Sequence, residues 1–334
     1  MNPDWLQKFR LRAGATAKGI YTRYPKHCLY PGCEQPPINS HSQQARGALS
    51  TIARDGKVVT LNREVFRIVL QGIEQERPHE HLCCQTIKQA STFKGFCAKH
   101  DSELFREIEC RPLSVGNIEQ ALAFHRRAMA FELRNKTDMN TFLWAYFNLQ
   151  KPLDLYPPKL EQELKIHRIL IDGDFEFIWA PLWEQRAWQN IDCVWRVIDH
   201  PIGVSMASSI PAITASQLLT YSNRHLDLVK NTIDCPRPSF TLTIVPQSAN
   251  THVVMVWNRC MEPFIGPFRD RMSSTDNTIF SEFLNWCVFC MSEDYCLGPD
   301  LWDSLSPETK GILEEDLHPE PYCLQMIVPD IIKV

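Results

Sequence analysis

The sequence predicts an α+β fold with an N-terminal zinc module, a helical middle and a C-terminal mixed α/β part. Three observations predict it: two pairs of potential metal ligands near the N-terminus, a long central stretch with helical spacing of apolar residues, and a last third rich in β-branched and aromatic residues. The chain has 334 residues, of which 44% are hydrophobic, so it can bury a core and form two domains or one domain with a large elaboration. We place the zinc module at residues 1–112 and the helical and α+β region at residues 113–334.

In the first region, residues 42–56 have apolar residues near helical spacing and end in Asp-Gly, so we expect a short helix. Residues 57–62 and 64–73 are typical of strands. Residues 74–90 are polar, and we expect an insertion there. A short amphipathic helix over residues 95–109 closes the region.

The longest helix is expected over residues 117–150, where Asn117 can cap its start, and a second helix over 160–173. From about Phe175 onward the sequence favours strands. We expect strands within residues 193–210, 240–258 and 322–334, a hairpin turn at Ser-Ala-Asn in the middle one of these, and a buried helix or strand at 281–291.

The formal net charge is −4, so no overall positive field requires a nucleic-acid partner. The charge is uneven, however. Residues 1–60 hold nine basic and three acidic residues, whereas residues 300–334 hold two basic and eight acidic residues. A basic front end fits a phosphate-facing surface, and an ordinary solvated surface explains it equally well.

No apolar signal segment opens the chain, and no apolar run approaches the roughly 18 residues of a membrane span. We therefore expect a soluble cytoplasmic protein without a membrane partner. In that compartment the 13 cysteines are expected to be thiols and metal ligands rather than disulfides.

Four residues form a predicted zinc site. Cys28 and Cys33 flank a Pro-Gly turn that can point two thiolates at one place. Cys97 and His100 are three apart in the first turn of the predicted helix at 95–109, so they face the same way. The alternative is a set of unrelated thiols. A zinc knuckle followed by a ligand pair on a helix is the treble-clef arrangement, in which a structural Zn²⁺ supplies folding free energy.

The segments "NSHS" and "FCAKHD" resemble the HNH nuclease group, in which a treble clef carries a catalytic histidine. His41 follows Cys33 where the first histidine of the motif falls, and Asp101 stands where the last one would fall. The middle asparagine has no clear counterpart, and Ser91 or Thr92 are nearest. The resemblance covers about residues 25–110, and the same segments are similar to uncharacterised bacterial abortive-infection and phage-defence proteins.

The resemblance implies metal-assisted phosphodiester hydrolysis. His41 would be the general base, and Asp101 would help to hold a catalytic Mg²⁺ or Mn²⁺. Arg46, Arg54 and Lys99 would contact nucleic-acid phosphates. Alternatively, His41 orients a zinc ligand or replaces His100, and Asp101 only stabilises its helix.

Three further groups have simpler explanations. "PHEHLCC" (78–84) could hold a second metal, but a surface insertion explains it better. Cys287 and Cys290 lie among apolar residues and are expected to be buried thiols rather than a redox pair. The charges at residues 126–136 fit a solvated helix face, with phosphate contact as the alternative.

Three functions remain open at this point. The first is an HNH-like endonuclease acting on DNA or RNA, with a C-terminal region that regulates it or recognises a protein partner. The second is a non-catalytic zinc-stabilised module that binds nucleic acid or protein, as a sensor or scaffold. The third is an enzyme whose site lies in the C-terminal part.

Overall fold

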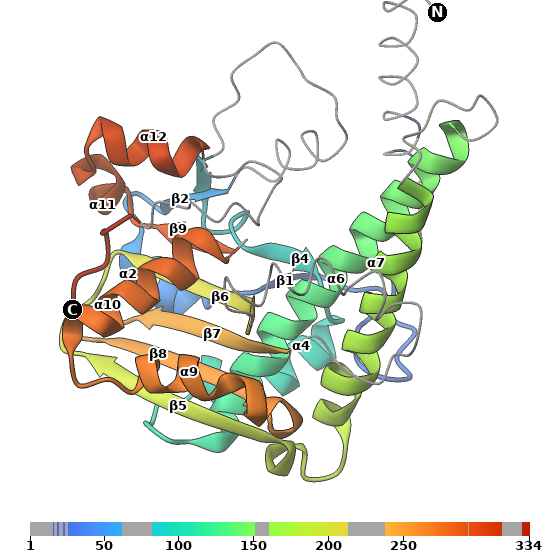
Figure 1. Cartoon of the computed structure of the whole chain (residues 1–334), viewed down its shortest axis with the longest axis horizontal. Helices are drawn as coiled ribbons and strands as arrows, with labels where there is room; N and C mark the ends of the chain where they lie inside the picture. The colour runs from blue at the N-terminus through green and yellow to red at the C-terminus, as the bar shows by residue number, and fades with distance from the viewer. Residues whose placement is uncertain are drawn as a thin grey trace, which may run out of the picture.

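The centre of the molecule is a seven-stranded antiparallel sheet in the order β3-β2-β9-β6-β7-β8-β5 (Figure 1). The computed structural model describes residues 16, 19, 23, 26–61, 82–150, 160–212, 238–292, 294–315 and 329–334. The strands of this sheet are β2 (Lys57–Leu61), β3 (Leu82–Thr86), β5 (Ile191–Ile198), β6 (Val204–Pro211), β7 (Ser239–Pro246), β8 (Thr251–Asn258) and β9 (Tyr295–Leu297).

Two sequence-distant parts of the chain meet in the sheet. The hairpin β2–β3 comes from the N-terminal region, and β9 from the C-terminal region pairs with both β2 and β6. The seven-stranded sheet therefore contains strands from both sides of residue 112, where we expected the two regions to divide. Whether the two regions divide the function stays a prediction.

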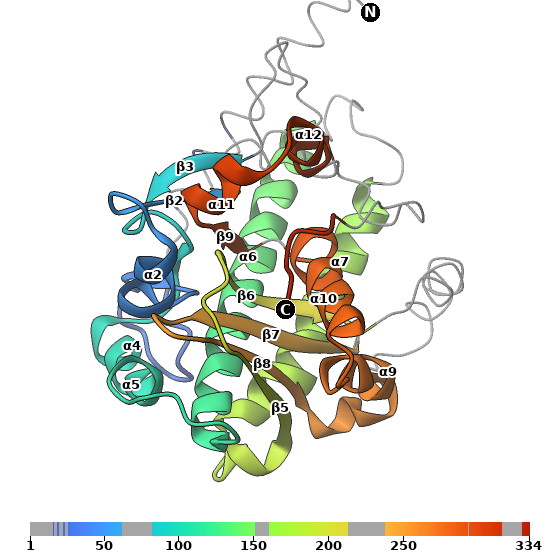
Figure 2. The same ribbon diagram turned by 90° about the vertical axis from the view of Figure 1, so that its left-hand side faces the viewer.

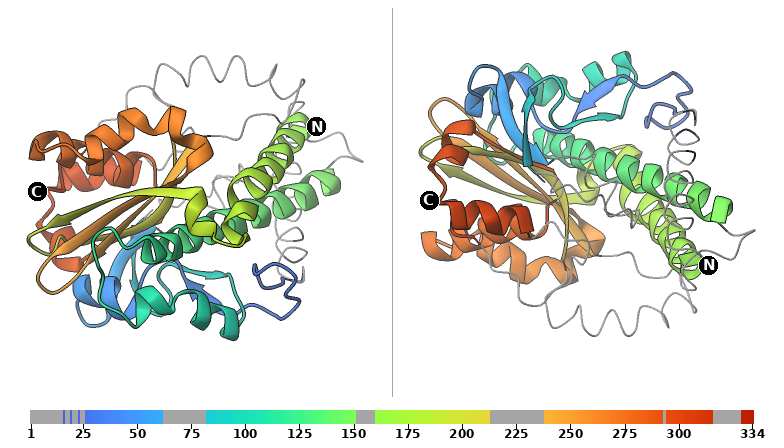
Figure 3. Two further views of the ribbon diagram at one scale, coloured as in Figure 1. Left: turned by 90° about the horizontal axis from the view of Figure 1, so that it is seen from below. Right: turned by 90° about the horizontal axis from the view of Figure 1, so that it is seen from above.

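Both faces of the sheet are covered (Figure 3). Every residue of β7 and β8 is buried, and the middle of β8 is accordingly a continuous apolar run, Val-Val-Met-Val-Trp. On one face lie α9 (Glu262–Met272) and α10 (Asn277–Asn285), where Phe240 of β7 packs against Phe268 and Phe283. The long helix α6 (Ile118–Gln150) crosses the other face, and the N-terminal elements lie beside it (Figure 3).

Helix α6 begins where its sequence predicts. The side chain of Asn117 accepts hydrogen bonds from the backbone N–H groups of Glu119 and Gln120 at 3.0 and 3.1 Å. The helix then runs beyond the sheet together with α7 (Leu160–Asp174), and the two form a hairpin that extends from the body in Figure 1.

A buried polar network attaches α6 to the sheet. The imidazole of His125 is hydrogen-bonded to the Thr241 hydroxyl at 2.7 Å and to the Asn258 amide oxygen at 2.8 Å. Asn258 in turn donates to the carbonyl of Ile178. Burial lowers the pKa of His125 to about 4, so the histidine is neutral at pH 7. The network fixes the helix to β7 and β8 without a buried charge.

The N-terminal region adds a second, two-stranded sheet. Strands β1 (Asn39–His41) and β4 (Thr92–Lys94) pair antiparallel, and α4 (Ala98–Leu104) follows directly. Figure 2 shows these elements beside the body of the molecule. The remaining short elements are η1 (Ala45–Leu49), α2 (Ser50–Ile52), α5 (Arg106–Glu109), η3 (Phe175–Trp179), η4 (Ala180–Trp183), η5 (Ala187–Asn190), η6 (Arg259–Met261), η7 (Trp286–Cys290), α11 (Pro299–Ser304) and α12 (Pro307–Glu315).

The mixed α+β composition is confirmed, with differences in detail. Residues 82–86, expected in a polar insertion, form the edge strand β3. The helix expected over 95–109 is broken at Phe105 into α4 and α5. Residues 281–290 are helical, and residues 329–334 are not a strand. The expected strand at 64–73 lies outside the described residues.

Among the helices that the structure describes, none combines the length and the apolar character that a bilayer span needs.

Candidate metal centre

Two backbone turns present the four predicted ligands. Cys28 and Cys33 flank a tight turn closed by a hydrogen bond from the Cys33 N–H to the Tyr30 carbonyl at 3.0 Å. Gly32 in this turn has φ +73°, which glycine adopts without steric cost. Cys97 is the N-cap residue of α4, and His100 lies in its first turn.

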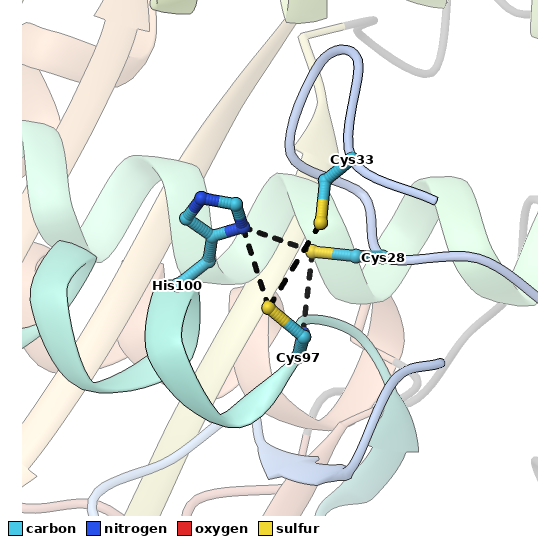
Figure 4. Close-up of side chains that lie close together, drawn as sticks. All are labelled: Cys28, Cys33, Cys97 and His100. Atoms are coloured by element: carbon cyan, nitrogen blue, oxygen red, sulfur yellow. Dashed lines mark hydrogen bonds between the residues drawn. The ribbon is translucent and has the colours of Figure 1, made fainter. Parts of the chain in front are cut away.

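Backbone hydrogen bonds hold the two pairs against each other. The N–H of Leu29 donates to the Gly95 carbonyl at 3.0 Å, and the N–H of Ile38 donates to the Phe96 carbonyl at 2.8 Å. These bonds place the knuckle directly over the start of α4. Figure 4 shows the four side chains pointing toward one another from the knuckle and the helix.

The ligand atoms have the spacing of a tetrahedral site. All four lie within 4.8 Å of one another. His100 Nδ1 is 3.5 Å from Cys28 Sγ and 3.4 Å from Cys97 Sγ, and Cys33 Sγ is 4.0 Å from Cys97 Sγ. Tetrahedral zinc bonds of about 2.3 Å to sulfur and 2.1 Å to nitrogen require about 3.8 Å between sulfurs and about 3.6 Å between sulfur and nitrogen. The cluster can therefore bind a metal ion, and its ligand set is consistent with zinc.

The two buried thiols have opposite pKa shifts. The backbone N–H of His100, and to a smaller degree that of Lys99, lowers the pKa of Cys97. Burial raises the pKa of Cys28 to about 11, although the N–H groups of Cys97 and Tyr30 donate to its sulfur at 3.2 and 3.5 Å. The helix start thus stabilises one thiolate, and a coordinating divalent cation would deprotonate the other.

An aromatic wall connects the cluster with the rest of the molecule. Tyr30 stacks on the His100 ring at 3.9 Å, and Trp183 meets Tyr30 edge-on at 5.1 Å. Arg126 of α6 lies over the Trp183 ring at 4.8 Å and donates to the Leu182 carbonyl. No periodic pattern in the sequence indicates this wall, because Tyr30 lies in a turn and Trp183 ends the short η4, far apart along the chain.

The structure brings His41 and Asp101 into one electrostatic neighbourhood. His41 is the last residue of β1, and Asp101 lies in α4. Burial lowers the pKa of His41, while the Ala90 carbonyl and the carboxylates of Glu109 and Asp101 oppose this shift. The imidazole is therefore neutral at pH 7 and can accept a proton.

Of the residues nearest the missing asparagine, Thr92 pairs with His41, and Ser91 precedes it. The Ser91 carbonyl accepts two hydrogen bonds from Ser42, from its N–H at 2.8 Å and from its hydroxyl at 3.0 Å. Ser91 has φ +53°, a left-handed conformation that is strained for a serine. This turn fixes the end of β1.

The three expected phosphate contacts lie in different surroundings. Arg46 and Lys99 are exposed. Arg54 instead forms ion pairs with Asp300 at 2.8 Å and Asp303 at 2.7 Å, two of the acids near the C-terminus. Part of the basic front end is thus neutralised within the chain.

The other cysteine groups show no second metal cluster in the described residues, where the four-residue set is the single group found. Cys83 and Cys84 lie on β3, so the insertion expected there is wrong at these residues, and His79 and His81 lie outside the described residues. Cys287 is fully buried, and burial raises its pKa, as expected for a core thiol. Cys290 is partly exposed.

Arg127 and Glu109 both act electrostatically on His41, and the solvated helix face expected at residues 126–136 is wrong for Arg127. Arg127 of α6 is 4% exposed and forms a 2.6 Å ion pair with Glu109. In the sequence Arg127 is one of several charges on a long helix, and no pattern distinguishes it from its neighbours.

Comparison with known proteins gives no further guidance, because no family model, curated protein or solved structure matches the chain.

Proposed function

We propose that the chain is a zinc-stabilised, HNH-like endonuclease that hydrolyses nucleic-acid phosphodiesters with a second, catalytic divalent ion. The observation that carries the proposal is the placement of His41 and Asp101. A knuckle, the paired strands β1 and β4 and the helix α4 occur in this order along the chain, with β2 and β3 of the main sheet inserted between β1 and β4. The Asp101 carboxylate on the helix contributes to the pKa of His41, the histidine that ends β1. Order and placement agree with what the resemblance to HNH nucleases implies.

In this proposal the Cys28, Cys33, Cys97 and His100 cluster holds a structural Zn²⁺ that fixes α4 against the knuckle. The site is closed, since four protein ligands fill a tetrahedral zinc shell. Catalysis would use the neighbouring residues. Zinc would thus act by holding Asp101 and His41 in register.

His41 would accept the proton of an attacking water, because its lowered pKa keeps it neutral at pH 7. Asp101 would contribute one oxygen ligand to Mg²⁺ or Mn²⁺, ions that bind through one or two carboxylates together with water and substrate phosphate. Such an ion, when bound, stabilises charge on the leaving oxygen. Arg46 and Lys99 are exposed and could contact phosphates beyond the cleaved bond.

The test is cleavage of DNA and of RNA, single- and double-stranded, with Mg²⁺ or Mn²⁺. We expect His41→Ala to lower the cleavage rate about 10²- to 10⁴-fold, the usual contribution of a general base. His200→Ala is the control, because that histidine is exposed and follows β5. Zinc content and melting temperature should match the wild type in both variants. Equal cleavage by wild type and His41→Ala would contradict the assignment.

A second candidate is a non-catalytic zinc-stabilised module that binds nucleic acid or protein. The Asp101 carboxylate in place of a histidine favours it, as does the buried Nδ1 of His41, which has no hydrogen-bond partner. Tight oligonucleotide binding without cleavage under any of these conditions would select this candidate. A role in phage defence stays a prediction from the resemblance.

A further inference from the structure

Arg127 is the most deeply buried charge near His41. Its guanidinium lies over the Phe105 ring at 4.2 Å and pairs with the Glu109 carboxylate at 2.6 Å. Its positive charge contributes to the lowered pKa of His41, and Glu109 acts on the same imidazole in the opposite direction. Arg127 and Glu109 therefore lie within electrostatic range of the proposed catalytic base.

The Arg127 guanidinium has N–H groups that form no hydrogen bond. A guanidinium has five N–H donors, and in Arg127 the Nε is buried without a hydrogen-bond partner. Arg127 Nη1, which forms the ion pair with Glu109, also has no hydrogen-bond partner, nor do His41 Nδ1 at the end of β1 and Ser91 Oγ in the turn before β4. Buried polar atoms are normally paired, so a ligand or water can supply the partner that Arg127 Nε lacks.

Several contacts tie these residues to one junction. Ser42, which follows His41, bonds to the Ser91 carbonyl. Gln44 donates to the carbonyl of Ile108, the residue before Glu109. These contacts connect the end of β1 and the turn before β4 to α5, and Arg127 connects α5 to the middle of α6.

We propose that Arg127 is a phosphate-binding residue of this site, and that Glu109 occupies its guanidinium until a substrate phosphodiester displaces the carboxylate. The proposal rests on the proposed nuclease function and names a regulated anion subsite within it. Carboxylate and phosphate bind the same planar fork of donors, so one can replace the other.

The side chains of Arg127 and Glu109 are held to different degrees, and this difference decides which of the two can move away. Arg127 is held by α6 and by the Phe105 ring, and its side chain is 5% exposed. The Glu109 side chain is 33% exposed and lies at the end of α5, a helix of four residues. Glu109 can turn into solvent while Arg127 stays in place. Such a movement would uncover a preorganised cation beside His41.

The same segment contains a matched pair for comparison. Glu107 and Arg111 form a 2.8 Å ion pair one helical turn apart, and the Glu107 side chain is 26% exposed. Arg111 is 60% exposed at the side chain, so this pair covers no buried cation. Removing the Glu107 charge changes the net charge as much as removing the Glu109 charge does.

The experiment measures the affinity of a fluorescein-labelled single-stranded oligonucleotide, as DNA and as RNA, for full-length protein carrying His41→Ala, so that binding is observed without turnover. We expect Glu109→Gln to tighten binding about tenfold, and Arg127→Gln to weaken it about tenfold or more. Glu107→Gln should change the affinity much less than Glu109→Gln. The double variant Arg127→Gln/Glu109→Gln should bind like Arg127→Gln alone, because the effect of Glu109 requires Arg127.

Tighter binding by Glu109→Gln that disappears in the double variant supports the proposal. It is overturned if Glu109→Gln does not tighten binding, if Glu107→Gln tightens it equally, if the gain survives without Arg127, or if no protein in the set binds. The double variant removes both charges together, so it guards against unfolding caused by one unpaired buried charge. The nuclease function fails separately, when wild-type protein binds in this pattern and does not cleave.

Discussion

The metal-cluster region and the central sheet are built in different ways. Around the cluster the elements are short: β1 and β4 have three residues each, and α4 has seven. In the sheet, β5 to β8 have eight residues each, and β7 and β8 are buried throughout. Short elements bury little apolar surface, so the first region needs cross-links, whereas the second is held by its core.

The two regions are nevertheless one packed structure. The Tyr30 ring joins His100 to Trp183, and Arg126 of α6 covers Trp183. Phe93 of β4 also packs edge-on against Phe131 of α6 at 5.5 Å. A bound metal ion would therefore order a local region, while the large helix and the sheet provide the support on which that region rests.

The largest effect is expected from loss of a metal ligand. Cys97→Ser should abolish stoichiometric zinc binding and strongly lower amide hydrogen-exchange protection over residues 92–104, because the cluster joins the knuckle to α4. Protection in β7 and β8 should persist. Zinc analysis and hydrogen exchange with mass spectrometry measure both outcomes.

Cys84→Ser is the matched control, since Cys84 is exposed on β3 and lies outside the cluster. It should keep the zinc content and the exchange pattern. Substoichiometric zinc in the wild type, together with normal folding of Cys97→Ser, would remove the contrast between a metal-dependent region and a core-dependent one.

The next effect concerns the sheet. Phe283 of α10 is fully buried and stacks near Phe240 and Trp286. Phe283→Ala should lower the free energy of unfolding by about 3–5 kcal/mol and leave zinc content unchanged. Urea unfolding measures this change in the free energy of unfolding. Phe264→Ala, at a residue 38% exposed in neighbouring α9, should cost far less. A loss of zinc in Phe283→Ala would show that the two regions fold as one unit.

A smaller effect depends on pH. The pKa of His125 is about 4 in the fold because the ring is buried, compared with about 6.5 in the unfolded chain. The neutral ring stabilises the fold fully above pH 6.5, and this stability is lost as the pH falls toward 4. Between pH 7.5 and pH 5 the loss should be about 2 kcal/mol.

The measurement is urea unfolding at both pH values, for wild type and His125→Gln. The glutamine variant is expected to be less stable at pH 7.5, because the bonds to Thr241 and Asn258 change. Its further decline to pH 5 should be smaller than that of the wild type by about the same 2 kcal/mol. Equal declines in the two proteins would mean that the pKa of His125 is the same in the folded and the unfolded chain.

The smallest effect is expected at Arg54, which links α11 to the turn before β2. Exposed ion pairs contribute little and are screened by salt. Arg54→Ala should therefore shift the melting temperature less than Cys97→Ser, Phe283→Ala or His125→Gln, and high salt should abolish the difference. If nucleic-acid affinity also falls in this variant, Arg54 exchanges its acidic partners for phosphate.

Local patterns predicted several features correctly. Asn117 caps the long helix, the hairpin turn falls at residues 247–250, and Cys28, Cys33, Cys97 and His100 gather in one cluster. In each case the signal lies within a few residues, or in a pair of such short signals with compatible chemistry. Such signals survive folding because backbone geometry around a turn or a helix start depends mainly on local sequence.

Long-range pairing was not predictable in the same way. Nothing in the sequence of residues 82–86 indicates that they form an edge strand, since Cys-Cys-Gln in a polar stretch is a weak strand signal. The break of the helix at Phe105 also follows from context, because that ring is buried against Phe96 and under Arg127.

The sequence by itself determined the helix starts, the tight turns and the two residue pairs of the candidate metal cluster, because each depends on residues close along the chain. Only the tertiary structure decided that β9 joins the N-terminal hairpin to the main sheet, and that Arg127 is buried against the Phe105 ring and pairs with Glu109. The physical reason is that such contacts join residues far apart in sequence. Their free energy depends on burial and on charges that exist only after the chain has packed.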